Sequence, residues 1–131
     1  MLVEANERQD IPKREKLSDN FSRDEFACPC CGEDRIDRTL IQKLQELRLS
    51  YGRPIVVTSG VRCPKHNEEV NGEKFSSHLY GFAVDIACAD SSQRWELVSL
   101  AMRRFRRVGV YSGWVHLDVD PTKPQDVMWV G

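Results

Sequence analysis

Apolar residues recur at helical spacing from residue 37 to residue 51. Charged and amide side chains fill the positions between them, so the pattern predicts a helix with one buried and one solvated face. Asp37 or Asp34 is placed to cap the first turn, Gly52 ends the helix, and Pro54 prevents its continuation. The buried stripe consists of Leu40, Ile41, Leu44 and Leu47.

A second long helix is predicted after Asp90 and Ser91, which together suit its N-terminal cap. Its apolar stripe would consist of Trp95, Val98, Ala101, Met102 and Phe105. Its last turn would carry a cluster of arginines, namely Arg103, Arg104, Arg106 and Arg107. We interpret this cluster as the solvated end of a helix rather than an anion-binding surface, because the net charge of the chain is only −1.

Strict alternation of apolar and polar residues predicts two strands, at residues 82–88 and 114–120. A short β-branched strand is expected at residues 54–58, and residues 127–130 are a candidate edge strand. The apolar faces of the two alternating strands consist of Val84, Ile86 and Cys88, and of Val115, Leu117 and Val119. This order of elements predicts an α+β fold in which a small, largely antiparallel sheet packs with two main helices.

The length and composition fit one globular domain: 131 residues, of which 40% are hydrophobic and 30% are charged. Residues 1–17 have few apolar anchors and many charges, so we expect a flexible N-terminal arm in front of a domain at residues 18–131. Near the start of that domain, Ser22 and Glu25 form the pattern of a capping box for a short helical turn. We expect the domain to act as a monomer.

Several classes of protein are excluded by the same numbers. No apolar run approaches the roughly 20 residues that span a bilayer, so no membrane span is expected. The first residues lack the apolar segment of a secretory signal, and we therefore expect synthesis in the cytoplasm without a signal peptide. The balanced charge gives no reason to expect a nucleic-acid partner.

The candidate chemistry lies on the polar faces of the two alternating strands. Asp85 lies on the first strand and His116 on the second, so both would point into one groove if the strands are neighbours. His78 lies on the loop that leads into the first strand, and Gly81 lets that loop turn back. Two histidines and a carboxylate are the ligand set of a catalytic zinc site with one open position. The sequence therefore predicts a zinc site formed by these three side chains.

The motifs around these residues resemble those of a known family. Residues 76–85 are similar to the Ser-x-His-x-x-Gly-x-Ala-x-Asp signature of zinc D-alanyl-D-alanine carboxypeptidases. Residues 59–62 resemble the Ser-Gly-x-Arg segment of that family, and residues 115–119 resemble its final ligand strand. Residues 21–26 and the Cys-Cys-Gly that follows resemble the entry segment of its small phage and bacterial members.

This resemblance implies a single-domain zinc peptidase that acts on the stem peptides of peptidoglycan, as a carboxypeptidase or an endopeptidase. It also implies that His78, Asp85 and His116 are the metal ligands. Arg62 would face the substrate carboxylate or the developing oxyanion, a task that suits its planar fork of donors. Ser77 would orient His78 or touch the substrate. By analogy with the lysis enzymes of phages (endolysins), the protein would act on the cell wall after a phage-type release.

One departure from the family concerns the general base. Many relatives place Glu or Asp three residues before the last histidine ligand, and here that position is Gly113. Asp118 lies on the same strand face as His116 and is the best substitute, although it could equally support the histidine; Asp120 is a poorer choice. The missing acid leaves open an alternative function, namely a non-catalytic zinc module that binds the cell wall or builds a virion.

The five cysteines, an odd number, argue against a complete set of disulfides. Cys28 and Cys31 share the spacing of a zinc-binding pair, and so do Cys63 and His66. Together they could hold a second, structural zinc, while the alternatives are a disulfide between Cys63 and the Cys28 cluster or simply free thiols. Cys88 continues an apolar strand face and is expected in the core.

Overall fold

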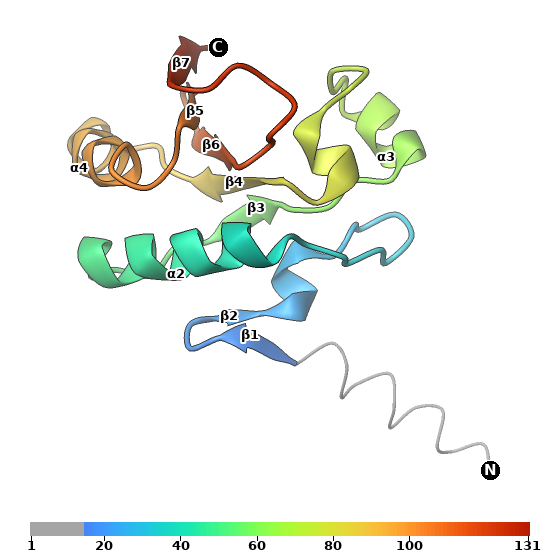
Figure 1. Cartoon of the computed structure of the whole chain (residues 1–131), viewed down its shortest axis with the longest axis horizontal. Coiled ribbons are helices and arrows are strands. Elements are labelled where there is room, and N and C mark those ends of the chain that lie inside the picture. Colours follow the sequence, from blue (N-terminus) through green and yellow to red (C-terminus); the bar gives the residue numbers. More distant parts are fainter. Residues whose placement is uncertain (1–14) are drawn as a thin grey trace.

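The computed structural model describes residues 15–131, and it confirms the predicted α+β fold (Figure 1). A five-stranded sheet, a two-stranded hairpin, three α-helices and two short 3₁₀ helices make up the described part of the chain. The predicted N-terminal arm lies outside the described residues up to residue 14, and its last residues belong to the first strand. In chain order the elements are β1 Lys16–Ser18, β2 Phe21–Ser22, η1 Arg23–Phe26, α2 Arg38–Tyr51, β3 Val57–Ser59, α3 Pro64–Glu69, η2 Ser77–Tyr80, β4 Ala83–Ala87, α4 Ser91–Ala101, β5 Arg107–Val110, β6 Trp114–Asp118 and β7 Val127–Val130.

The strand order of the main sheet is β3-β4-β6-β5-β7. All pairs are antiparallel except β5 with β7, so the prediction of a largely antiparallel sheet is confirmed. The two alternating strands of the sequence, β4 and β6, are neighbours at the centre of the sheet. Their register places Asp85 directly opposite His116, and Ala83 opposite Asp118.

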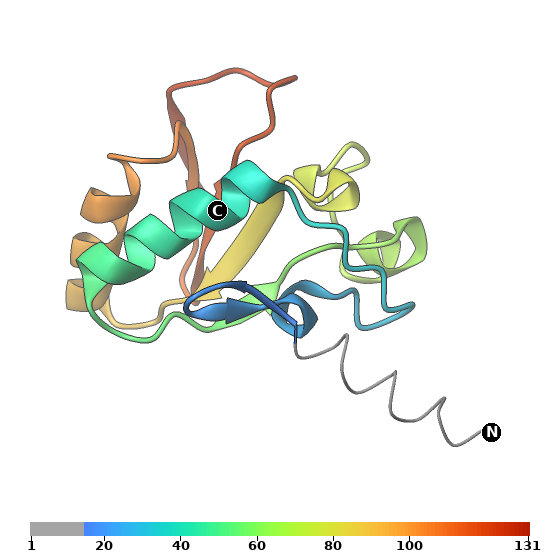
Figure 2. The same cartoon turned by 60° about the horizontal axis from the view of Figure 1, so that its bottom comes forward.

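Helices α2 and α4 cover one face of the sheet (Figures 1 and 2). The predicted first helix forms as α2, with Asp37 as its N-cap and Gly52 in the left-handed conformation at its C-terminus. Its apolar stripe packs against the apolar faces of β4 and β6 in one core that includes Leu40, Leu44, Leu47, Val84, Ile86, Val115 and Leu117. Because side chains alternate along a strand, the polar residues of β4 and β6 project from the opposite face.

Several predicted elements have different bounds in the structure, with β4 and β6 shorter than predicted at Ala83–Ala87 and Trp114–Asp118. Strand β3 pairs over Val57–Ser59, later than the predicted residues 54–58. Helix α4 ends at Ala101, and the predicted stripe is wrong in two places because Trp95 is 77% exposed and Met102 is 59% exposed. The helix instead buries Leu97 with Ala101, which lie about one turn apart and face the core.

The arginine cluster was also assigned to the wrong element. Arg107 does not end a helix; it begins β5 and is only 8% exposed. A charged side chain is buried only when it is paired, and Arg107 meets the carboxylate of Asp118 at 2.7 Å. The other arginines of the cluster stay at the surface or partly exposed. No helix within residues 15–131 has the length and apolar character needed to cross a membrane.

Candidate metal centre

Three side chains from separate elements converge on the polar side of the sheet. His78 comes from η2, Asp85 from β4 and His116 from β6. Nε2 of His78 lies 3.2 Å from Oδ1 of Asp85, and Nδ1 of His116 lies 3.0 Å from the same oxygen. The three candidate ligand atoms all lie within 4.8 Å of one another. The structure therefore brings together the three residues that the sequence predicted as ligands.

The outward-facing nitrogen of each imidazole has its own acceptor. Nδ1 of His78 donates to the carbonyl oxygen of Gly60 at 2.7 Å, and Nε2 of His116 donates to Oδ2 of Asp118 at 2.7 Å. Each ring then turns a lone pair toward Asp85. Two nitrogen lone pairs and a carboxylate oxygen in contact repel one another unless a cation or proton lies among them. This donor set fits Zn²⁺, which takes imidazole nitrogen and carboxylate oxygen and is held by histidines whose other nitrogen is hydrogen-bonded.

The pKa shifts of His78 and Asp85 agree with that donor set, whereas the shift of His116 favours a positive charge on its own ring. Burial lowers the pKa of the His78 imidazole, which keeps it neutral. Burial raises the pKa of the Asp85 carboxyl, but the polar contacts with the His116 and His78 imidazoles outweigh burial and hold the pKa well below its usual range. Burial lowers the pKa of His116, but its contacts with Asp118 and Asp85 reverse that effect and raise it. Positive charge is therefore favoured at the point where the three side chains meet.

The loop ligand is placed by its own turn. The Ser76 hydroxyl accepts the backbone N–H of His78 at 3.2 Å and caps η2. Gly81 ends the turn at φ 76°, in the left-handed region. A Cβ atom at Gly81 would collide with the carbonyl oxygen of Arg35. Only glycine fits there, and the turn can therefore carry His78 back over β4.

Arg62 lies beside Asp85. Its Nη2 atom donates to Oδ2 of Asp85 at 3.2 Å, the oxygen that does not face the histidines. Its Nε atom donates to Ser59 at 3.1 Å and its Nη1 atom to Asn67 at 3.2 Å. A guanidinium has five N–H donors, so two remain for other acceptors. Arg62 lines the pocket in front of the three candidate ligands.

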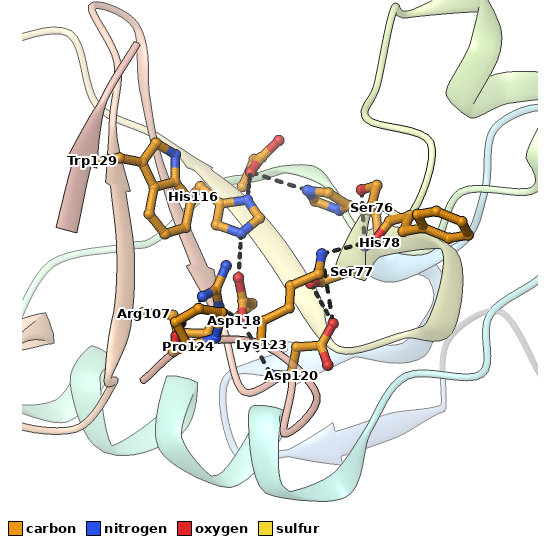
Figure 3. Close-up of polar contacts among 12 residues, drawn as sticks. Ser76, Ser77, His78, Arg107, His116, Asp118, Asp120, Lys123, Pro124 and Trp129 are labelled. Atoms are coloured by element: carbon orange, nitrogen blue, oxygen red, sulfur yellow. Dashed lines mark hydrogen bonds and ion pairs between the residues drawn. The ribbon is translucent and has the colours of Figure 1, made fainter. Parts of the chain in front are cut away.

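Both carboxylate oxygens of Asp118 are already engaged. Oδ2 accepts from His116, and Oδ1 accepts Nε of Arg107 at 2.7 Å and the backbone N–H of Asp120 at 3.0 Å. Asp118 is 1% exposed. Figure 3 shows this chain of contacts, with the Trp129 ring beside both His116 and Arg107. Arg107 and Trp129 were missed by sequence reasoning, because neither belongs to a motif and the pairing of β5 with β7 brings them here.

Ser77 is held by a second polar group next to the histidine turn (Figure 3). Its hydroxyl donates to Oδ2 of Asp120 at 2.7 Å and accepts Nζ of Lys123 at 2.9 Å. Lys123 also donates to the carbonyl oxygen of Phe75 at 2.7 Å. These contacts join η2 to the segment that follows β6. The Ser77 hydroxyl is therefore engaged by Asp120 and Lys123, and neither of these contacts involves His78.

A pocket of about 550 Å³ opens in front of the three candidate ligands. The stacked rings of Tyr111 and Trp114 belong to its wall, with centroids 4.5 Å apart. Glu73 also lines it, exposed, and its carboxylate has no ion-pair or hydrogen-bond partner within residues 15–131. Sequence reasoning missed Glu73, which lies in an irregular loop. Gly113 is exposed and adds no polar side chain.

The cysteines form a separate group. The structure brings together Cys28, Cys31 and Cys63, whose sulfur atoms lie within 4.8 Å of one another. Burial raises the pKa of Cys28, but backbone N–H groups outweigh it and lower the pKa to about 7. His66 does not join this group, because its ring lies on α3 with Nδ1 3.7 Å from Glu69. Cys88 is 5% exposed in the core, as predicted.

Comparison with known proteins agrees with this geometry. A sequence profile of the family described as peptidase M15 matches residues 19–118. The match covers the capping box of η1, the Arg62 segment and all three candidate ligands. No curated protein matches the chain in a sequence search. Because the profile spans most of the chain and ends just beyond the last candidate ligand, the chain belongs to the peptidase M15 family and is a hydrolase of the metallopeptidase class.

Proposed function

We propose that this metallopeptidase uses zinc to hydrolyse D-Ala-containing amide bonds in the stem peptides of peptidoglycan. The observation that carries the proposal is the convergence of His78, Asp85 and His116 at the base of an open pocket. Both outer imidazole nitrogens are hydrogen-bonded, the arrangement that zinc ligands require. The substrate class follows from the resemblance of the motifs to the D-alanyl-D-alanine carboxypeptidases. Its site of action would be the cell wall.

His78, Asp85 and His116 would hold the metal. When bound, zinc would polarise the scissile carbonyl and lower the pKa of water to about 7. The residues around the ligands fix their protonation: Gly60 holds the His78 tautomer, and Asp118 holds that of His116. Arg62 restrains the second oxygen of Asp85, so that the first one stays turned toward the histidines.

The proton of the attacking water needs an acceptor in the pocket. The sequence favoured Asp118, but its two oxygens are saturated by His116, Arg107 and a backbone N–H. These contacts favour the supporting role that the sequence left open for it. Glu73 lines the same pocket with a free carboxylate, and we assign the role of general base to Glu73.

The substrate side of the pocket is cationic and aromatic. Arg62 retains two N–H donors, which suit the carboxylate of a peptide terminus or a developing oxyanion. Lys123 lines the pocket as well, although three oxygens already surround its ammonium group. The stacked pair of Tyr111 and Trp114 offers an apolar wall for the peptide backbone.

Purified muropeptides test this proposal directly. The zinc-loaded protein is incubated with them, and the products are followed by mass spectrometry. We expect loss of a terminal D-Ala for a carboxypeptidase, or scission within a peptide or cross-link for an endopeptidase. The variant His116→Ala should produce neither. If wild type and His116→Ala are equally inactive, the enzyme proposal fails, and binding of both to intact cell walls would support the non-catalytic module.

A further inference from the structure

We propose that a second metal ion, a structural Zn²⁺, is held by Cys28, Cys31 and Cys63 with Cys30 as the fourth ligand. The three central sulfurs are already within 4.8 Å of one another and belong to no part of the peptidase pocket described above. Clusters of soft thiolates select zinc over harder ions, and four sulfurs give the closed tetrahedral shell of a structural site. The proposal does not depend on the peptidase activity.

The backbone around these sulfurs is arranged for thiolates. The chain turns back after Cys28, where the N–H of Gly32 donates to the Cys28 carbonyl at 2.8 Å and Gly32 adopts φ 83°. The N–H of Cys63 donates to Sγ of Cys28 at 3.4 Å, and the N–H of His66 donates to Sγ of Cys63 at 3.4 Å. Peptide N–H groups directed at sulfur stabilise the charged form that binds metal.

The position of Cys30 in the chain makes it the candidate for the fourth ligand. Cys30 lies in the same turn, between Cys28 and Cys31 in the chain, and its exposed thiol is not among the three sulfurs within 4.8 Å of one another, so a rotation of its side chain would have to bring it in to close the shell. His66 was the candidate from sequence spacing, but its ring is directed along α3 toward Glu69. The backbone N–H of His66, rather than its imidazole, reaches the sulfur group. We therefore assign the fourth place to Cys30.

A metal here would join two loops that support the peptidase centre. The loop of Cys28 follows η1, while Cys63 directly follows Arg62. The N–H of Val61 donates to the carbonyl of Phe26 at 2.8 Å, so the two loops are already in backbone contact. Gly60, in the same segment, accepts the hydrogen bond from His78. The metal would thus fix the segment that positions both Arg62 and the carbonyl behind His78.

Counting metal ions in purified full-length variants tests the proposal. Wild type prepared under reducing conditions should contain two zinc ions per chain by mass spectrometry of the dissolved metal. His116→Ala and Cys31→Ser should each contain one, and the double variant should contain none. Cys88→Ala, which removes a core thiol outside the group, should keep both. If the Cys31→Ser variant keeps one zinc ion and the circular dichroism spectrum of the wild type, it is folded. The loss of the other zinc ion can then be attributed to the sulfur site.

Cobalt identifies the ligands. In His116→Ala, Co²⁺ should give the charge-transfer absorption of a cobalt thiolate, and Cys63→Ser should abolish it. Cys30→Ser should weaken binding and change the spectrum, whereas His66→Ala should leave both unchanged. The opposite result for these two variants would overturn the assignment of Cys30. The wild type could instead contain a single zinc ion per chain and show two fewer free thiols in a titration than its cysteine content predicts. That result would indicate a disulfide and would overturn the proposed zinc site.

Discussion

The two groups of candidate metal ligands differ in how the fold builds them. The histidine–aspartate centre draws two of its residues from neighbouring central strands, and its members His78 and Asp85 are buried. The sulfur group of Cys28, Cys31 and Cys63 is built from two loops, and its member Cys31 is exposed. Ligands on paired strands are placed by sheet register before any metal arrives, whereas ligands on loops gain order from the ion itself. The first group suits chemistry and the second suits stability.

The two groups share one short segment. Gly60 accepts from His78, Arg62 donates to Asp85, and Cys63 belongs to the sulfur group. A change that disturbs this segment should therefore affect both groups. A change in one group that leaves this segment in place should affect mainly activity, for the histidine–aspartate centre, or mainly stability, for the sulfur group.

The largest expected effect comes from removing a ligand of the histidine–aspartate centre. His116→Ala should abolish peptide hydrolysis, because the metal loses a ligand and Asp118 loses its partner. Product formation from muropeptides and the zinc content of the variant are the measurements. His66→Ala is the matched control, since that histidine lies outside both groups, and it should keep full activity.

A variant that removes the proposed base should leave both metal groups intact. Glu73→Gln keeps the shape of the side chain but cannot accept a proton, so kcat should fall by about 10²–10⁴-fold. Zinc content and thermal unfolding should match those of wild type. Glu68→Gln, on α3 and outside the pocket lining, is the control. Unchanged turnover in Glu73→Gln would remove Glu73 from the mechanism.

The supporting role of Asp118 gives a smaller effect on a different quantity. Asp118→Asn removes the charge that faces His116 and Arg107, so metal affinity should fall by roughly 10–100-fold. Competition with a chelator measures that affinity. Asp126→Asn breaks an exposed pair with Arg106 and should change little. Wild-type metal affinity combined with lost turnover in Asp118→Asn would instead return Asp118 to the role of base.

The smallest effect should come from the shared segment. A Cβ atom at Gly60 would lie 2.6 Å from both Cα and the carbonyl oxygen of Phe26, so Gly60→Ala must push the two loops apart. We expect a loss of about 1–3 kcal/mol in the free energy of unfolding, measured by denaturant titration. Gly113→Ala meets no atom within 4 Å and should be neutral. Equal stability of the two variants would mean that the loops are not coupled at this point.

Local patterns in the sequence were sufficient for most of the secondary structure. The stripe and caps of α2, the alternation of β4 and β6, and the capping box of η1 all appear where predicted. They succeed because each depends on residues only a few positions apart. The end of α4 was misjudged because Arg107 looks like a helix terminus locally, whereas its partner Asp118 comes from another strand.

The sequence by itself determined which residue types could bind metal, since His78, Asp85 and His116 carry the motifs and alternate with core residues. Only the tertiary structure decided their surroundings. Strand register brought Asp85 opposite His116, and loop packing brought Cys28 to Cys63. The supporting contacts are long-range hydrogen bonds whose partners have no fixed spacing in the chain. For that reason motifs could indicate the candidate metal ligands, but the residues that hold them in place emerged only from the fold.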